Sequence, residues 1–461
     1  MKRKPVIIVA SLIVANFLAQ LMQTMLNTAL PQMMLDLGIQ VNRAQWLITV
    51  YLLVSGIVIP VTGFLIGKYS TRTLFFASAG AFTTGTLIAG FSVDFTLILC
   101  GRIIQGIGAG LLVPVFLNTI ILVFPKEKLG AAMGLASLIV GLAPALGPTI
   151  SGFVIQNHSW RILFYGVAPI AIANLFVAYY CLENVWDTHK AKLDWRSILY
   201  SSLGFGCLLY GFSILSDQGK GIQLALTFLI VGFAVSFLFV KRQFKLAVPL
   251  LDFNVFRYPR FTYASIIGVV LFIVMAGVEL LLPIYAQNVR GLLPRESGVM
   301  LPPDALLMGV SGVVSGKIYD RYGGRYLIRI GFFGIAAVTA LLTIALSIHA
   351  PYGLLVGLYA LLMTGVGFMM TPITAFAMAS LPNSMMNYAS PMTTAIRTFG
   401  MSMGGALLIT LVTITADYSS FSFPINMHQG IQAAFWSLAL VAASGFLLTF
   451  FVPYGKGSVE S

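Results

Sequence analysis

The sequence predicts an all-α polytopic membrane protein. Of its 461 residues, 58% are hydrophobic and only 9% are charged, and the mean hydropathy is +0.93. Soluble domains are typically about 45–50% apolar and about 25% charged, so this composition excludes an ordinary globular enzyme, a disordered chain and a disulfide scaffold. A membrane-spanning helix needs about 20 mostly apolar residues, and fourteen such runs follow one another with only short connections.

The first six predicted helices are apolar runs separated by short loops. The first run follows a basic opening, and it is too long for the hydrophobic part of a cleavable signal peptide. The later runs are separated by Arg43, by Lys68 and Arg72, by a short break before residue 96, by Lys126 and Lys128, and by Arg161. We expect these helices at about 6–29, 44–66, 73–92, 96–122, 130–155 and 161–182.

Eight further runs complete the set. Two of them, about 197–216 and 222–240, lie between the most charged connections, about 183–196 and 241–261. The last six are at about 262–288, 298–317, 325–348, 352–379, 391–416 and 430–453. We therefore expect a six-helix bundle, two extra helices with linkers and a second six-helix bundle, at 1–183, 184–260 and 261–461.

The distribution of Lys and Arg predicts the orientation, because cytoplasmic loops carry more of them than external loops. With the N-terminus in the cytoplasm, the inner loops and ends hold 20 basic residues and the outer loops hold 5. Arg102 and Arg397 lie within helices and complete the total of 27. Removing one helix would invert every later loop and abolish the bias. The net charge of +13 therefore reflects topology rather than nucleic-acid binding, and both termini are expected in the cytoplasm.

An internal repeat relates the two six-helix groups. The segment from Gly63 to Tyr69 recurs 253 residues later as the segment from Gly316 to Tyr322. Each copy lies in the inner loop after the second helix of its group. Internal repeats are the usual organisation of secondary transporters, whose substrate site lies between the repeats near the membrane midplane. The two extra helices account for the long offset between the copies.

Further motifs lie in both groups. The second copy of the repeat matches a Gly-x-Leu-x-Asp-Arg-x-Gly-Arg pattern through Gly316, Asp320, Arg321, Gly323 and Arg325. Helix four contains Arg102 followed by Ile-Ile-Gln-Gly-Ile-Gly-Ala-Gly, and helix five contains a Gly- and Pro-rich run with Gly141, Pro144, Gly147 and Pro148. Over nearly the whole chain, the sequence resembles the major facilitator superfamily, in particular its fourteen-helix drug:proton antiporter branch.

The resemblance implies a major facilitator fold with 14 transmembrane helices, arranged as six, two and six. It implies a proton-coupled antiporter that exports hydrophobic or cationic small molecules, as in multidrug efflux, by alternating access in a bacterial cell membrane. It also implies that Arg102 belongs to the proton-transfer machinery and that the helix-five motif is associated with antiport. The sequence departs from this branch in helix one, where Met22 occupies the position of an acidic residue. Proton coupling at that position is therefore not carried over.

Two acidic residues, Glu279 and Asp304, lie within predicted helices, where a carboxylate costs about 2.5–3.5 kcal/mol on insertion scales. Both fall in the outer half of the membrane. A carboxyl group in a low-dielectric cavity binds its proton more tightly, so a proton and a cationic substrate would compete for the same charge. We interpret both as proton-coupling and substrate-binding groups. The alternatives are a helix cap for Asp304 and a structural hydrogen bond for Glu279.

Other candidate residues have both functional and structural interpretations. Polar side chains in helix one recur every three or four residues and form one stripe, from which we expect Gln20, Gln23 and Asn27 to contribute to the substrate site. Arg102 is either part of proton transfer or a hydrogen-bonding hub, and Arg397 is expected to extend to the membrane interface. The small residues and prolines of helix five permit close packing and bending. Asp320, Arg321 and Arg325 are expected to form a charge network in the loop.

The remaining functional classes lack their motifs. The sequence contains no HExxH and no GxxxxGK[ST], its four histidines are isolated and its three cysteines have no metal spacing. We therefore expect no enzyme, no ATP-driven pump, no cofactor and no metal. A channel is less consistent with repeated halves and hinge-like helices. We expect a monomer whose partners are lipophilic small-molecule substrates, protons and the lipid bilayer. The alternative is a proton-coupled exporter or importer of one metabolite, lipid or peptide.

Overall fold

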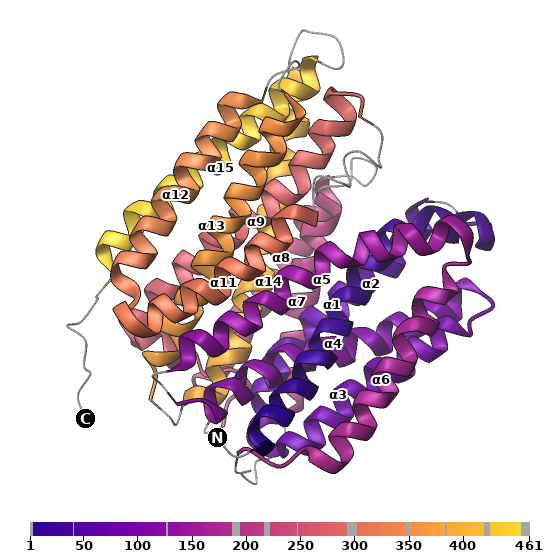
Figure 1. Ribbon diagram of the computed structural model, residues 1–461, viewed down its shortest axis with the longest axis vertical. Coiled ribbons are helices and arrows are strands. Elements are labelled where there is room, and N and C mark those ends of the chain that lie inside the picture. Colours follow the sequence, from indigo (N-terminus) through magenta and orange to yellow (C-terminus); the bar gives the residue numbers. More distant parts are fainter. Residues whose placement is uncertain are drawn as a thin grey trace.

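The computed structural model describes residues 3–39, 41–125, 128–186, 194–215, 222–246, 248–292, 302–346, 351–382, 385–418 and 425–452. Long α-helices dominate this part of the chain and run back and forth past one another (Figure 1). They are α1 (Arg3–Leu37), α2 (Val41–Lys68), α3 (Thr71–Gly90), α4 (Phe95–Val123), α5 (Leu129–Asn157), α6 (Arg161–Cys181), α7 (Trp195–Leu215), α8 (Ile222–Gln243), α9 (Pro259–Ile284), α11 (Pro302–Tyr322), α12 (Gly324–Ala345), α13 (Tyr352–Ala379), α14 (Met386–Tyr418) and α15 (Ile425–Phe451).

Several helices differ in their bounds from the sequence-based expectation. α11 begins at Pro302, since a proline fits the first helical position, where the N–H has no helical partner. α14 begins at Met386 and contains Pro391 within it, which membrane helices tolerate because neighbouring groups satisfy the freed carbonyl. A short 3₁₀-helix, η2 (Phe253–Arg257), precedes α9, and a π-helical turn, η3 (Tyr285–Val289), extends it.

Most of these helices suit a lipid environment. Within the described residues, eleven helices are long and apolar enough to cross a membrane, and α5, α7 and α11 are not among them. Large apolar side chains such as Ile230, Phe237 and Leu440 are exposed on the outside of the fold, where hydrocarbon would surround them. The chain is therefore an all-helical, multi-pass membrane protein, whereas the count of fourteen spans stays a prediction.

The helices form two bundles with matching internal contacts. In the first bundle, α1 packs against α5 and α6, while α4 packs against α2 and α3. In the second, α9 packs against α14 and α15, while α13 packs against α11 and α12. Each of these pairs has a counterpart in the other bundle, as expected of two repeats with one ancestral topology. The division into three domains remains a prediction.

The two extra helices lie beside both bundles. α7 packs against α8, and it also contacts α2 of the first bundle and α14 of the second. The rings of Tyr210 in α7 and Trp46 in α2 have centroids 5.8 Å apart. On the other side of α7, the ring centroids of Phe212 in α7 and Phe399 in α14 are 5.7 Å apart in an edge-to-face arrangement. The single helix α7 therefore contacts both bundles, through α2 in the first and α14 in the second.

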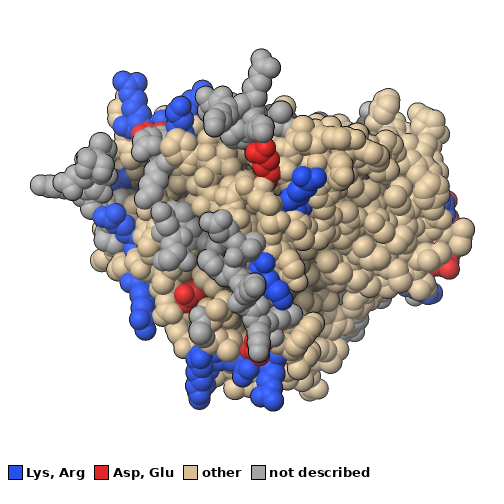
Figure 2. All heavy atoms as spheres, turned by 90° about the horizontal axis from the view of Figure 1, so that it is seen from below, with Lys and Arg blue, Asp and Glu red and all other residues tan. Residues whose placement is uncertain are grey.

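The bundles meet near one end of the molecule. α1 begins and α15 ends at the same end (Figure 1), which we name the termini end. There α5 packs against α11, and a Cβ atom at Gly134 would lie only 2.8 Å from the Gly312 carbonyl oxygen. Gly130 and Gly316 approach each other even more closely, because glycines allow helix backbones to touch. Seen from below, Lys and Arg gather toward one side of the molecule (Figure 2).

Candidate functional site

An acidic and a basic side chain lie within electrostatic reach of each other inside the second bundle. Glu279 is half-buried near the end of α9, and Arg397 is half-buried about three turns into α14. The Glu279 carboxylate interacts electrostatically with the Arg397 guanidinium. The guanidinium also covers the ring of Phe272, with its Cζ atom 4.7 Å from the ring centroid. Each charge offsets part of the cost of burying the other in the membrane.

The position of Arg397 differs from the expectation that it extends to the membrane interface. Because α14 begins at Met386 and not near residue 391, Arg397 lies farther inside the helix than the hydropathy pattern indicates. Sequence reasoning therefore missed it as a candidate site residue. The signal that could have found it is its charge, which is opposite to that of Glu279 on a helix of the same bundle.

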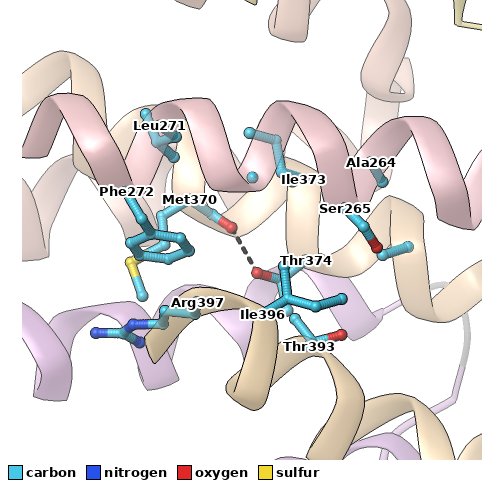
Figure 3. A pocket seen from close by; sticks show the side chains of 12 residues that line it. Ala264, Ser265, Leu271, Phe272, Met370, Ile373, Thr374, Thr393, Ile396 and Arg397 are labelled. Atoms are coloured by element: carbon cyan, nitrogen blue, oxygen red, sulfur yellow. Dashed lines mark hydrogen bonds between the residues drawn. The ribbon is translucent and has the colours of Figure 1, made fainter. Parts of the chain in front are cut away.

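A small cavity adjoins Arg397 between α9, α13 and α14 (Figure 3). Its volume of about 20 Å³ is enough to hold a water molecule when polar groups surround it. The hydroxyl-bearing residues that line it are Ser265, Thr374 and Thr393. The two threonine hydroxyls each donate a hydrogen bond of 2.8 Å to the carbonyl four residues earlier, whereas the buried Ser265 Oγ has no hydrogen-bond partner among the described residues. Nothing in the sequence pattern had indicated this cavity.

Arg102 forms a hydrogen-bonding hub in the first bundle. It is fully buried in α4, and its Nε donates to the Leu47 carbonyl at 2.9 Å. Its Nη1 donates to Gln105 Oε1 at 2.9 Å, and its Cζ atom lies 4.2 Å from the ring centroid of Tyr51. Gln105 in turn donates to Thr86 Oγ1 at 2.8 Å. These contacts join α2, α3 and α4, while the Nη2 atom finds no hydrogen-bond partner in the described part of the chain.

The polar stripe of α1 divides into a structural and an accessible part. Asn16 is buried, and its Nδ2 donates to the carbonyls of Leu12 at 3.1 Å and Leu112 at 3.3 Å, which ties α1 to α4. Gln20 and Gln23 are half-buried and Asn27 is exposed. The three predicted substrate-site residues are therefore the accessible ones, and they belong to the bundle opposite that of Glu279.

The helix-five motif lies where α5 crosses α1. A side chain at Gly147 would collide with Thr24 of α1, and Thr24 Oγ1 donates to the Ala143 carbonyl at 3.4 Å. Pro148 is half-buried. The side-chain surroundings of three other predicted residues, Gly141 and Pro144 of α5 and Asp304 of α11, lie outside the described residues.

Asp320 joins the two bundles at the termini end. Its Oδ1 accepts a hydrogen bond from the Gly130 N–H at 2.7 Å, and its Oδ2 accepts one from the Ala131 N–H at 2.9 Å. Both N–H groups belong to the first turn of α5, where backbone donors lack helical partners and the helix dipole favours a negative charge. Asp320 thus binds the backbone of the other bundle, next to the close approach of Gly316.

The rest of the loop motif surrounds a tight turn between α11 and α12. Gly323 has φ +74°, a left-handed conformation that glycine adopts without the steric cost of a Cβ atom. Arg321 and Arg325 are exposed. The Cζ atom of each lies near the ring of the tyrosine that follows it, at 5.2 Å and 6.0 Å from the ring centroid. Asp320 therefore accepts its hydrogen bonds from α5. The sequence had instead suggested a charge network between Asp320 and these two arginines.

Comparison with known proteins identifies the family of this chain. Residues 12–405 match the family model of the Major Facilitator Superfamily. The chain is 38% identical to the MFS-type transporter YcnB of Bacillus subtilis, with 96% of this chain and 94% of that protein covered. It is 34% identical to the lincomycin resistance protein LmrB of Listeria monocytogenes, with 99% and 98% covered.

A solved structure shares the fold. The human organic anion transporter MFSD10 superposes with a TM-score of 0.67 over 97% of this chain and 100% of that chain, at 14% sequence identity. This likeness concerns the fold alone. The family match and the relatives together show more: the chain belongs to the Major Facilitator Superfamily and is a membrane transporter of that family.

Proposed function

We propose that this protein is a proton-coupled antiporter that exports hydrophobic or cationic small molecules from a bacterial cell, and that it belongs to the fourteen-span drug:proton branch. In this proposal it lies in the plasma membrane with both termini in the cytoplasm, so the termini end is the cytoplasmic end. The similarity to lincomycin resistance proteins supports drug export. The excess of basic residues in the loops that are predicted to lie inside supports the orientation.

The observation that carries the proposal is Glu279, a half-buried carboxylate within electrostatic reach of Arg397. Such a group can be stable with or without its proton, because Arg397 compensates its charge and a low-dielectric surrounding favours its neutral form. A cationic substrate would replace the proton as the partner of the carboxylate. Competition between the two for one negative charge is the simplest physical basis for exchange.

The arrangement of the bundles supports alternating access. The described contacts between them include those at Gly130, Gly134 and Asp320, which lie toward the termini end. In the proposed orientation, this conformation is closed toward the cytoplasm. Gln20, Gln23 and Asn27 would then contact the substrate from the first bundle, while Glu279 and Asp304 would contact it from the second. Arg102 would hold the first bundle in shape beside this site.

The Glu279→Gln variant tests the proposal, because glutamine keeps the size of the side chain and cannot exchange a proton. In everted membrane vesicles, a panel of cationic dyes and lincomycin-type antibiotics is added across a range of pH. We expect the wild-type protein to release protons on substrate addition. We expect Glu279→Gln to abolish this release and proton-driven transport, with unchanged expression.

Asp94→Asn is the matched control. Asp94 is exposed at the start of α4, where its Oδ1 accepts the Leu97 N–H at 2.8 Å, and asparagine caps a helix equally well. This variant should transport like the wild-type protein. Wild-type coupling in Glu279→Gln would remove Glu279 from the mechanism, and passive flux without exchange would contradict an antiporter.

A further inference from the structure

We propose that the linker between α8 and α9 is a latch that closes the line of contact between α2 and α14, which we name the α2–α14 seam. The residues of the latch are Leu250 and Leu251. They hold this seam at the place where the sequence repeat supplies a carboxylate to the contact between α5 and α11. The proposal rests on the alternating access proposed above, and it adds a device that must be released before the carrier opens at the termini end.

The repeat makes the α2–α14 seam the counterpart of the contact between α5 and α11. In the matching contact patterns of the two bundles, α2 corresponds to α11 and α14 corresponds to α5. Within the repeated segment, Gly63 corresponds to Gly316 and Gly67 corresponds to Asp320. Asp320 accepts hydrogen bonds from the first turn of α5. Because Gly67 has no side chain, α2 cannot close its own seam in that way.

The linker occupies the counterpart position instead. A Cβ atom at Gly316 would overlap the backbone of α5. At Gly63, a Cβ atom would lie 2.6 Å from the Leu250 carbonyl oxygen of the linker. The next nearest atoms would be Cγ of Pro391 in α14 at 3.5 Å and Cδ2 of Leu251 at 3.6 Å. The linker, α2 and α14 therefore meet at one glycine, and the linker backbone stands where the backbone of α5 stands at the other contact.

The latch is apolar and lies deep in the fold. Leu250 and Leu251 are only 1% and 0% exposed. Next to Pro391, the buried Ser390 Oγ donates to the Pro114 carbonyl of α4 at 2.9 Å, so the start of α14 is docked on the first bundle. Removing apolar surface from water stabilises a contact roughly in proportion to the area. Opening this seam toward the cytoplasm would expose both leucines to water, which opposes the opening.

The latch is fastened to the extra helix pair. Gln243 is buried in the last turn of α8, and its Oε1 accepts a hydrogen bond from the Leu250 N–H at 2.7 Å. Its Nε2 donates to Ser197 Oγ of α7 at 2.9 Å. The ring of Phe253, which follows the latch, packs edge to face on Phe239 of α8, with centroids 6.0 Å apart. A movement of α7 and α8 would therefore carry the latch with it, which gives these helices a role in opening the termini end.

Gly63→Ala tests the latch, because the added methyl group would displace the Leu250 carbonyl, a backbone group. Spin labels at the exposed positions 128 and 317, in a cysteine-free variant, measure the distance between α5 and α11. They report the opening of the whole termini end rather than a local displacement at Gly63. Without substrate, we expect Gly63→Ala to raise the long-distance population about threefold or more.

Gly67→Ala is the matched control. It makes the same replacement about one turn later in α2, where a Cβ atom would meet nothing within 4 Å, and it should keep the wild-type distribution. An unchanged distribution in Gly63→Ala would overturn the latch. An equal shift in Gly67→Ala would overturn it as well, because the effect would then belong to glycine replacement in α2 and not to the linker.

If Gly63→Ala does not fold, Gln243→Leu decides, since it removes the hydrogen bond that holds Leu250. It should raise the same long-distance population, whereas Gln223→Leu, at the exposed start of α8, should not. The wild-type distribution in Gln243→Leu would refute the latch. A failure of the proposed function is distinguishable, because it appears as absent proton-driven transport by the wild-type protein, while the distance measurement uses neither a substrate nor a pH gradient.

Discussion

The two arginines within the bundles have different partners and therefore different roles. Arg102 is bound by the Leu47 carbonyl, the Gln105 amide oxygen and the Tyr51 ring, all of which are neutral. Its contacts are independent of protonation at Glu279. Arg397 interacts with Glu279 itself, so its energy changes when that carboxyl gains a proton. The contacts of Arg102 are thus structural, whereas Arg397 would respond to the protonation of Glu279 in the proposed mechanism.

Arg102→Lys should destabilise the first bundle. A lysine has a single ammonium group, which cannot reproduce the planar pair of contacts to Leu47 and Gln105. Leaving one buried acceptor unsatisfied costs about 1–3 kcal/mol. Thermal unfolding of the purified protein, followed by tryptophan fluorescence, should show a lower Tm for Arg102→Lys. An unchanged Tm would contradict the structural role.

Single residues show how far the sequence alone could lead. Glu279 and Arg102 could be singled out from the cost of a charge within an apolar run. The partner of Glu279 could not be predicted from the sequence, because the pairing depends on how α9 packs against α14 and on where α14 begins. The lone hydroxyl of Ser265 carries no sequence signal, since serine is common in membrane helices and only the packing around it creates a cavity.

At the scale of elements, the contact between α5 and α11 closes the termini end. It combines glycine-mediated backbone contact with the capping of α5 by Asp320. The sequence repeat indicated the residues of this motif. It could not indicate their partner, because the N–H groups of Gly130 and Ala131 belong to a helix of the other bundle.

Gly316→Ala should separate the two bundles at the termini end, because its Cβ atom would overlap the Gly130 carbonyl oxygen. We expect a larger population with a longer distance between spin labels at positions 128 and 317, which are exposed on α5's N-cap and on α11. The labels require replacement of Cys100, Cys181 and Cys207 by serine. Gly334→Ala is the control, because its Cβ atom would meet nothing within 4 Å. The same distance distribution in both variants would contradict this closure.

The extra helix pair is fastened at the termini end by an ion pair. Arg242 at the end of α8 donates to both carboxylate oxygens of Asp194, at 2.7 Å and 2.9 Å. Asp194 directly precedes α7 and also accepts a hydrogen bond from Ser197. The hydrogen bonds from Arg242 lower the pKa of Asp194 from its ordinary value to about 2. The ion pair therefore links the two ends of the helical hairpin.

Asp194→Asn should lower the Tm in a pH-dependent manner. The folded-state pKa of Asp194 is about 2, below the unfolded value of about 3.9. The carboxylate therefore stabilises the fold above about pH 4, and this contribution is lost as the pH falls toward 2. The Tm difference between the wild-type protein and the variant should be constant from about pH 5 to 8 and should shrink below about pH 4. A constant difference at all pH values would contradict this assignment.

At the scale of the whole molecule, the hydropathy pattern and the repeat could predict an all-helical membrane transporter with two similar bundles. Each bundle has its own contact pattern, and the two patterns match. The mutual position of the bundles could not be predicted from the sequence, because the repeat indicates only the arrangement within each bundle. That position depends on contacts between the bundles, such as those of Asp320. The position of α7 and α8 beside both bundles could not be predicted either, because their apolar runs do not differ from those of the other helices.

The position of α7 has a kinetic consequence. Because α7 touches α2 in one bundle and α14 in the other, any rotation of one bundle against the other must break or slide at least one of these contacts. In the proposed alternating-access cycle, the height of the barrier between the two access states therefore depends on a helix that contributes no predicted substrate-site residue. Sequence changes on this helix can adjust how fast the carrier cycles while its choice of cargo stays the same.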